Sequence, residues 1–141
     1  MSRQRQGFSS APSDQDPVTE ETIAAVQRWA QALNRQDVDG VMAAMTDDCV
    51  FESSYPQPDG TRYEGQNEVR AVWEEFFRAS PHSVFETEEL AAVGERCIFR
   101  WVHRWIDSDG NPEHCRGIDV LRVRDGRVAE KLVYYKRGSP R

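Results

Sequence analysis

From Val84 to Lys136 the sequence is strand-like almost without interruption. Apolar and polar residues alternate with the period of two that β-strands require, in four segments: Val84–Val93, Arg96–Asp107, Glu113–Arg124 and Arg127–Lys136. The connections between these segments are only a few residues long, so consecutive strands are expected to pair antiparallel as neighbours. Any fold for this chain has to contain this four-stranded meander.

The preceding half of the chain shows helical periodicity. Asp16, followed by a proline, provides an N-cap for a helix that ends near Gln36, and Asp37 caps a short second helix. A third helix begins after Gly65 and ends before Pro81. Its apolar residues form the clearest helical stripe in the chain: Val69, Val72, Trp73, Phe76 and Phe77.

A separate strand, Cys49–Tyr55, lies between the second and third helices and is followed by a loop rich in proline and glycine. Three helices, this strand and the meander predict an α+β fold with the helices on one face of a curved antiparallel sheet. We expect a single domain over residues 17–137, with flexible tails at residues 1–16 and 138–141.

The composition argues against several classes of protein. The chain of 141 residues carries a net charge of −6, which disfavours a nucleic-acid partner. No segment approaches the ~18 apolar residues of a membrane span, and no signal peptide is evident. Three cysteines without CxxC spacing predict a reduced, cytoplasmic protein. Three scattered histidines lack metal-ligand spacing, so we expect neither a metal nor a cofactor.

Large residues occupy both faces of the strand at 96–107. One face carries Phe99, Trp101, His103 and Trp105, and the other carries Ile98, Val102 and Ile106. Three helices can cover only one face of the sheet. We therefore expect a homodimer that buries the outer face.

Asp119 is an acidic residue in the otherwise strand-like and largely apolar run Ile118–Val128. A carboxylate that is removed from water needs a partner, a proton or a function. Asp119 is therefore a candidate functional residue.

The turn before this strand determines which residues lie near Asp119. Pro112 cannot donate a hydrogen bond within a strand pair and is expected in the loop, so that Asp107 pairs with Glu113. In this register His103 and Asp119 are diagonal neighbours on one face, with Cβ atoms about 7–8 Å apart. Their side chains could then meet directly or through a ligand.

The last hairpin has two possible registers. A two-residue turn at residues 125–126 would place Leu132 and Tyr134 on the same face as Asp119. A three-residue turn with its glycine in the left-handed conformation would instead place Lys131 and Tyr135 there. Lys131 would then lie opposite Asp119 and could keep it ionised.

Several motifs resemble those of the nuclear transport factor 2-like superfamily, and specifically its SnoaL-like branch, over residues 19–136. They are Leu33-Asn-Arg-Gln-Asp37, Thr46-Asp-Asp-Cys-Val-Phe-Glu52, Tyr63-Glu-Gly65 and Ile118–Val128. The resemblance implies a cone-shaped sheet wrapped around helices, a cystatin-like α+β barrel, and it favours the second register of the last hairpin. The branch includes ketosteroid isomerases, polyketide cyclases, epoxide hydrolases and proteins without known activity, so the resemblance implies a fold more strongly than a reaction.

The resemblance carries over to individual residues only in part. Asp119 matches the carboxylic acid that completes the oxyanion hole of ketosteroid isomerases. The isomerase tyrosine falls at Trp29 and the catalytic aspartate at Ser53, which cannot replace a carboxylate base. The aspartate that limonene epoxide hydrolases carry on the final strand falls at Val133.

These arguments give a candidate site in which His103 and Asp119 are catalytic. The candidate substrate-binding residues are Trp29, Ser53, Tyr55, Trp73, Phe77, Trp101, Lys131 and Tyr135. Aromatic side chains around a few polar groups suit a small apolar or aromatic ligand. The structural alternatives are a buried Asp119 bonded to Trp29 or to the backbone, and His103 as an ordinary core residue.

Two functions follow from this set. The first is a cofactor-independent isomerase, cyclase or lyase acting by proton transfer on an apolar cyclic metabolite, with His103 as base and Asp119 as acid or orienting group. The second is a non-catalytic ligand-binding or dimerisation module of the same fold. A thiol nucleophile at Cys115 is disfavoured, because its neighbour His114 should point to the opposite face.

Overall fold

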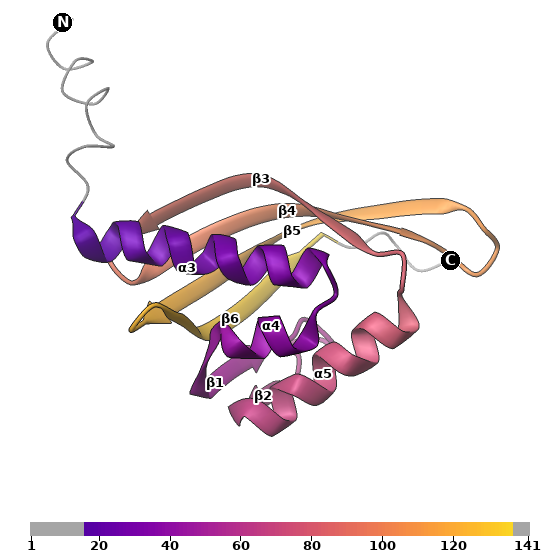
Figure 1. The fold of residues 1–141 in the computed structure, drawn as a ribbon. Helices are drawn as coiled ribbons and strands as arrows, with labels where there is room; N and C mark the ends of the chain where they lie inside the picture. The colour runs from indigo at the N-terminus through magenta and orange to yellow at the C-terminus, as the bar shows by residue number, and fades with distance from the viewer. Residues whose placement is uncertain (1–15, 137–141) are drawn as a thin grey trace, which may run out of the picture.

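The structure, a computed structural model, describes residues 16–136. Its elements are α3 (Pro17–Asn34), α4 (Val38–Ala43), β1 (Met45–Glu52), β2 (Arg62–Glu64), α5 (Gly65–Ala79), β3 (Val84–Val93), β4 (Arg96–Ile106), β5 (Pro112–Arg124) and β6 (Arg127–Tyr135) (Figure 1). The tails expected at 1–16 and 138–141 lie outside the described residues, apart from Asp16.

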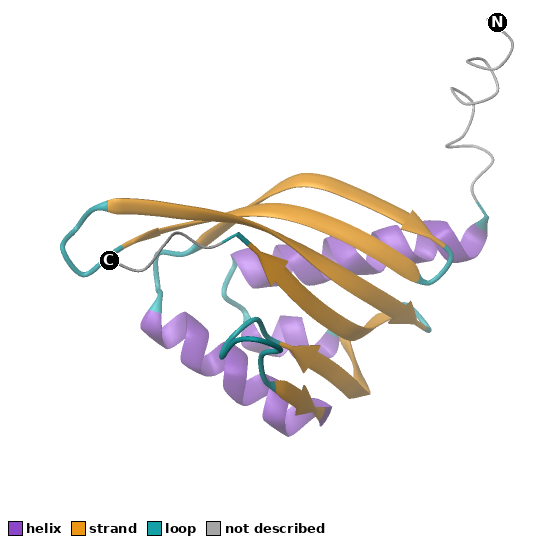
Figure 2. Ribbon diagram, turned by 180° about the vertical axis from the view of Figure 1, so that it is seen from behind, coloured by secondary structure: helices purple, strands orange, loops and turns teal. Residues whose placement is uncertain are grey.

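The six strands form one sheet in the order β2-β1-β6-β5-β4-β3. Neighbouring strands are antiparallel except for β1 and β6, which run parallel. The helices lie on one side of the sheet, which curves around them (Figures 1 and 2). The predicted α+β fold is confirmed. The sheet is mixed, however, and the short strand β2 has no counterpart in the sequence prediction.

The helices begin where their capping residues predict. The side chain of Asp16 accepts a hydrogen bond from the Thr19 amide at 2.8 Å, and that of Asp37 accepts one from the Gly40 amide at 3.0 Å. These contacts satisfy backbone donors that have no partner inside a helix. Gln36, with a φ of 56°, lies in the turn that separates α3 from α4.

The stripe on α5 packs onto the sheet as expected for an amphipathic helix. Val69, Trp73 and Phe77 are its buried members. The ring of Trp73 stacks on Phe51 of β1 and meets Trp29 of α3 edge-on, with centroids 5.6 Å and 6.2 Å away. An aromatic cluster therefore joins two helices to the concave face of the sheet.

The register predicted between β4 and β5 is wrong by two residues. Pro112 is the first residue of β5 and pairs with Ile106, so it does not lie in the loop. A proline at the end of a strand sacrifices no ladder hydrogen bond when its nitrogen faces away from the neighbouring strand. As a result Asp119 pairs with Phe99, and His103 pairs with Cys115. The two candidate catalytic residues keep the same face but are not diagonal neighbours.

The last hairpin reaches the second predicted arrangement by a different route. Arg124 pairs with Arg127 across a two-residue turn in which Asp125 and Gly126 both have positive φ. A bulge then shifts the register between Arg122 and Val123, where β6 contributes one extra residue. Because of this extra residue, the side chains of β6 beyond the bulge exchange their inner and outer positions. Lys131, Val133 and Tyr135 therefore lie on the inner face, although Lys131 pairs with Leu121 and not with Asp119.

Candidate functional site

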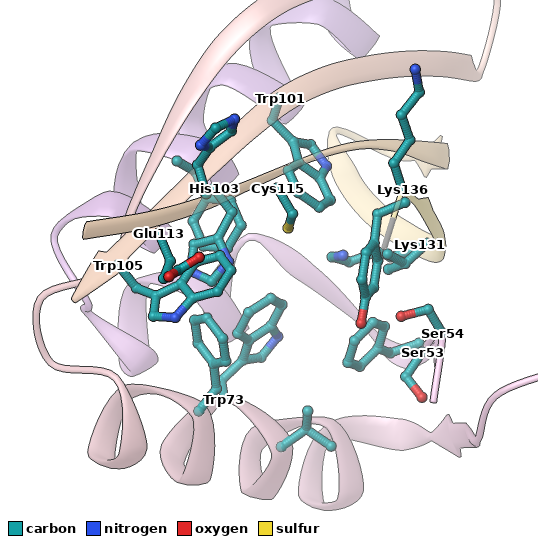
Figure 3. A pocket seen from close by; sticks show the side chains of 17 residues that line it. Ser53, Ser54, Trp73, Trp101, His103, Trp105, Glu113, Cys115, Lys131 and Lys136 are labelled. Atoms are coloured by element: carbon teal, nitrogen blue, oxygen red, sulfur yellow. The ribbon is translucent and has the colours of Figure 1, made fainter. Parts of the chain in front are cut away.

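A cavity of about 530 Å³ lies between α5 and the concave face of the sheet. Its walls are mainly aromatic: Phe51, Trp73, Phe76, Phe85, Trp101, Trp105 and Tyr135. The polar residues that line it are Ser53, Ser54, His103, Glu113, His114, Cys115, Lys131 and Lys136 (Figure 3). A cavity of this size with mainly aromatic walls suits a small, largely apolar molecule.

Lys131, in the wall of this cavity, forms a buried ion pair with Asp119. Lys131 Nζ donates a hydrogen bond to Asp119 Oδ1 at 3.1 Å, and the two side chains are only 6% and 3% exposed. The lysine nitrogen also lies 4.8 Å from the centroid of the Phe51 ring, and 5.6 Å and 5.7 Å from those of Trp73 and Trp29. The ring faces stabilise a cation at this position.

Burial shifts the two groups in opposite directions. It raises the pKa of the Asp119 carboxyl, which Lys131 and a hydrogen bond from the Trp101 side chain partly offset. It lowers the pKa of the Lys131 amine, which Asp119 partly offsets. The proton affinities of the two groups therefore approach each other, so that moving the shared proton between them costs less than it would in water.

Asp119 can act on a ligand in the cavity only through its contact with Lys131. It is 2% exposed and is not one of the residues that line the cavity. Lys131 lines the cavity, and its nitrogen points towards the middle of it (Figure 3). A ligand would thus meet the lysine, and the aspartate would set the position and protonation of that lysine.

His103 lines the cavity from β4. Its Nε2 lies 2.9 Å from Ser83 Oγ, and its ring stacks on Phe85 with the centroids 4.5 Å apart. Burial lowers the pKa of His103 to about 4, so the imidazole is neutral at physiological pH. A neutral imidazole has one nitrogen that can accept a proton.

His103 and Asp119 do not form a dyad. Their positions in the β4–β5 ladder are four residues apart, which corresponds to about 14 Å along a strand. This separation exceeds what the two side chains can bridge by a hydrogen bond. They can act on one ligand only if it extends along the cavity.

The structure brings six of the ten predicted site residues to the cavity: Ser53, Trp73, Trp101, His103, Lys131 and Tyr135. Trp29 and Phe77 are instead buried in the core, with 0% and 8% exposure. Tyr55 is 67% exposed and does not line the cavity. It belongs to the loop that follows β1, where the alternation of strand residues no longer applies.

The Ser53 hydroxyl makes two hydrogen bonds to backbone groups of the neighbouring loop. Its hydroxyl donates to the Tyr55 carbonyl at 2.9 Å and accepts from the Thr61 amide at 3.1 Å. Both contacts hold the loop that leaves β1. The geometry therefore occupies this hydroxyl with local backbone groups.

Cys115 lines the cavity and was missed by sequence reasoning. The alternation of strand residues separates Cys115 only from His114, its neighbour in the chain. Across the ladder its direct partner is His103, on the same face. The alternation of β5 could have revealed this, because Cys115 and Asp119 are four residues apart and share a face.

Gly117 allows an aromatic ring to cover the strand. A Cβ atom at this position would lie 2.5 Å from Trp101 Cζ2 and 2.7 Å from the Tyr135 Cβ. The space above this glycine is thus filled by the Trp101 ring. The ring then contacts both the cavity and the Asp119 carboxylate.

Within residues 16–136, no group of three histidine, cysteine or acidic side chains is arranged to hold a metal ion. No helix in the same part of the chain is long and apolar enough to cross a membrane.

Comparison with protein families places most of this chain in a known domain. The model of the SnoaL-like domain matches residues 26–131, which is well over half of the sequence. No curated protein is similar enough to match the chain.

Solved structures give the same result for the fold. A nuclear transport factor 2-like protein of unknown function from Mesorhizobium loti is 30% identical, with 86% of this chain and 96% of that chain covered and a TM-score of 0.73. An LEH-like epoxide hydrolase from M. tuberculosis is 25% identical, with 85% and 86% covered and a TM-score of 0.69. A proposed ketosteroid isomerase from Kribbella flavida is 19% identical, with 87% and 83% covered and a TM-score of 0.73. At this identity the last likeness shows the fold alone.

Proposed function

This chain belongs to the SnoaL-like domain family, and from that premise we propose that it catalyses proton transfer on a small, planar, apolar metabolite without a cofactor. The reaction class is isomerisation, cyclisation or elimination. The similar structures include proteins named for related chemistry, among them a proposed ketosteroid isomerase and proposed polyketide cyclases.

The buried Lys131–Asp119 pair is the observation that carries this proposal. Removing two charges from water costs several kcal/mol per ion, and apolar residues in their place are often equally stable. Such a pair beside a cavity is therefore better explained by a functional role than by stability. Its partners in the cavity wall are aromatic, which suits a planar ligand that presents one oxygen to the lysine.

The proposal assigns separate tasks to the polar groups. Lys131, in its ionised form, donates to a carbonyl oxygen and stabilises the negative charge that develops there. Asp119 is a positioning residue that acts through Lys131. His103 is the candidate base, because a neutral imidazole in the cavity can accept a proton. A substrate that contacts both Lys131 and His103 must extend along the cavity. It must also be conjugated, so that a charge on its oxygen can respond to proton removal at its other end.

The reactions of the related enzymes do not transfer directly. Ser53 cannot act as the carboxylate base of a ketosteroid isomerase, and its hydroxyl is engaged by the loop. Val133 occupies the position at which a limonene epoxide hydrolase carries an aspartate. We therefore propose proton transfer with a polar set of this chain's own.

A non-catalytic ligand carrier is the second candidate. The observation that favours it is the engagement of Asp119 by both Lys131 and Trp101, which leaves this carboxylate without access to a ligand. Such a carrier would bind the same planar molecules and leave them unchanged.

We also propose that the chain is a cytoplasmic homodimer. Ile98, Ile106 and Tyr134 project from the outer face of the sheet, with exposures of 43%, 50% and 54%. A second copy would cover them. The buried thiols of Cys49 and Cys97 suit a reducing compartment.

The test combines ligand binding with exchange of carbon-bound hydrogen. Trp73, Trp101 and Trp105 line the cavity, so a bound ligand should quench intrinsic fluorescence. A panel of steroids, phenols and planar polyketides is titrated, and each ligand that binds is incubated with the protein in heavy water. Mass spectrometry then measures deuterium incorporation into the ligand.

Saturable quenching together with deuterium incorporation would support the enzyme. We expect Lys131→Met and His103→Ala to reduce the incorporation. Arg70→Gln, which alters a surface ion pair with Asp39, is the matched control and should not affect it. Binding without exchange would favour the carrier, and the absence of any binding would refute both candidates.

A further inference from the structure

The chain carries its positive charge almost entirely as arginine. Its 18 basic residues comprise sixteen arginines and two lysines, Lys131 and Lys136. Both lysines line the cavity. Arginine does not lose its proton in proteins, whereas the amine of lysine does so when it is buried. Of the two lysines only Lys131 is buried, so it is the one at which a neutral amine could form.

Lys131 is held as a nucleophile would be. Its side chain is 6% exposed, and its nitrogen is directed into the cavity between aromatic rings (Figure 3). The carboxylate of Asp119 lies 3.1 Å from that nitrogen. The flat rings of Phe51 and Trp73 lie beside the amine, so a planar molecule would fit there best.

We propose that Lys131 forms an imine with a planar, cyclic aldehyde or ketone bound in the cavity, one that carries hydrogen on the carbon next to its carbonyl group. This inference rests on the proposed function and deepens it, because it names the substrate class and the covalent form in which the substrate is activated. A protonated imine draws electrons from the neighbouring carbon more strongly than a hydrogen-bonded carbonyl does. It therefore makes removal of a proton from that carbon easier.

The chemistry needs no reagent beyond the pair and the carbonyl compound. The proton first moves from Lys131 to Asp119, which leaves a neutral amine and a carboxylic acid. The amine then attacks the carbonyl carbon, a C–N bond forms, and proton transfer gives a carbinolamine. Asp119 donates its proton to the departing hydroxyl, the C–O bond breaks, and one water molecule leaves. The products are a protonated imine and the Asp119 carboxylate, again an ion pair.

Burial supports the first of these steps. It lowers the pKa of the lysine and raises that of the aspartate, so the neutral pair is closer in free energy to the ion pair than it would be in water. The protonated imine retains the positive charge, so the cation–π contacts of this site serve the intermediate as well as the free ammonium.

The test is reductive trapping on the full chain. The protein is incubated with naphthaldehyde and sodium cyanoborohydride, and the adduct is located by peptide mass spectrometry. We expect labelling of Lys131 at least about tenfold faster than that of Lys136, because the buried amine is positioned by Asp119 against a bound aldehyde, whereas Lys136 is exposed. Lys136 is exposed at the rim, has no part in the proposed reaction and serves as an internal control.

Two variants sharpen the result. Lys131→Arg retains the charge but cannot form an imine, so the selective adduct should disappear. Arg70→Gln, which alters only a surface ion pair outside the cavity, should leave it unchanged, and circular dichroism checks that both variants fold. The comparison of Lys131 with Lys136 by peptide mass spectrometry uses the wild-type chain, so it remains valid even if a variant does not fold.

The possible failures can be told apart. If naphthaldehyde quenches tryptophan fluorescence but Lys131 is labelled no faster than Lys136, the imine is refuted while the proposed function stands. If quenching and exchange are absent for every ligand, the proposed function fails as well. A selective adduct on Lys131 without hydrogen exchange would support the imine and limit the protein to carbonyl capture.

Discussion

Replacing Lys131 by methionine isolates the energetic role of the buried pair. Methionine keeps the length and apolar packing of the lysine side chain but removes the cation that faces Asp119. Breaking a buried ion pair by removing one partner costs about 3–5 kcal/mol, because the other charge remains without compensation. The side-chain exposures of 6% and 3% allow little solvent screening, so we expect a loss of this size near neutral pH.

The stability lost in the Lys131→Met variant should increase as the pH rises. Without Lys131, the folded-state pKa of Asp119 rises further above its unfolded value of about 3.9. Below that value the carboxyl is protonated in both states and its ionisation adds no cost. As the pH rises, the unfolded chain releases the proton and the folded chain does not, so stability falls by about 1.4 kcal/mol per pH unit. A total of about 3–5 kcal/mol therefore accumulates over roughly two to four pH units.

The wild-type pair should show no such slope. It holds one proton whether it is an ion pair or a neutral pair, and the unfolded aspartate and lysine together also hold one between about pH 5 and pH 9. Asp119→Leu should give the opposite slope. The unpaired lysine has a lowered pKa in the folded chain, so the unfolded chain binds the proton first and the stability of the variant falls as the pH falls.

The assay is urea denaturation at about pH 5 and about pH 8, with the single variants and the double variant Asp119→Leu/Lys131→Met. The double variant should recover most of the stability, or exceed the wild type by about 1–4 kcal/mol, and lose the pH dependence. Equal midpoints for Lys131→Met and wild type at both pH values would refute the reasoning, since the pair would then carry no buried charge.

Three further predictions concern other parts of the molecule. The imidazole of His103 should titrate with a pKa of about 4 by proton NMR, and stability should be lost as the pH falls from 6.5 towards 4, by less than about 3 kcal/mol because the ring is partly exposed; His103→Phe should remove this dependence. Gly117→Ala should push the Trp101 ring away, cost about 1–3 kcal/mol in thermal or chemical denaturation and weaken fluorescence quenching by ligands; unchanged stability and quenching would contradict the close packing. Ile98→Glu should convert a dimer to a monomer in sedimentation equilibrium, whereas Val18→Glu, at the exposed start of α3, should not.

The elements that could be predicted from the sequence are those with strong local signals. The caps at Asp16 and Asp37 and the stripe on α5 depend on residues within one or two helical turns of each other. All four meander strands are recognisable by their alternation, and in β4 and β5 it also separates the two faces. Strand β2 spans only Arg62–Glu64, too short for a period of two to be recognised.

Register could not be predicted with the same success, because it depends on single backbone groups. Pro112 was expected to end the loop on the assumption that its missing donor would interrupt the ladder. At the first position of β5 it pairs with Ile106, and this shifts Asp119 away from His103. In the next hairpin the bulge after Val128 has no marker such as glycine, so the inward position of Lys131 came from the resemblance and not from the turn.

The candidate site shows the same limit. Periodicity places Trp73 and Phe77 on one stripe, but only the structure shows that Trp73 reaches the cavity while Phe77 is covered by the core. Sequence reasoning identified Asp119 as a buried acid and Lys131 as a partner for it. It could not show which of the two faces a ligand, because this depends on the relative depth of two side chains on neighbouring strands.

The surroundings of the pair give an independent reason to place function there. The indole N–H groups of Trp29 and Trp73 are buried and have no acceptor among residues 16–136. Each such group costs about 1–3 kcal/mol relative to a satisfied one. Both rings also pack around the Lys131 nitrogen, so unsatisfied donors and a desolvated ion pair occur at the same place in the core. A core shaped by stability alone would replace these groups with apolar ones, and departures from that rule are expected at functional sites. If the double variant is more stable than the wild type but no longer exchanges or captures a ligand, stability and function oppose each other at Lys131 and Asp119.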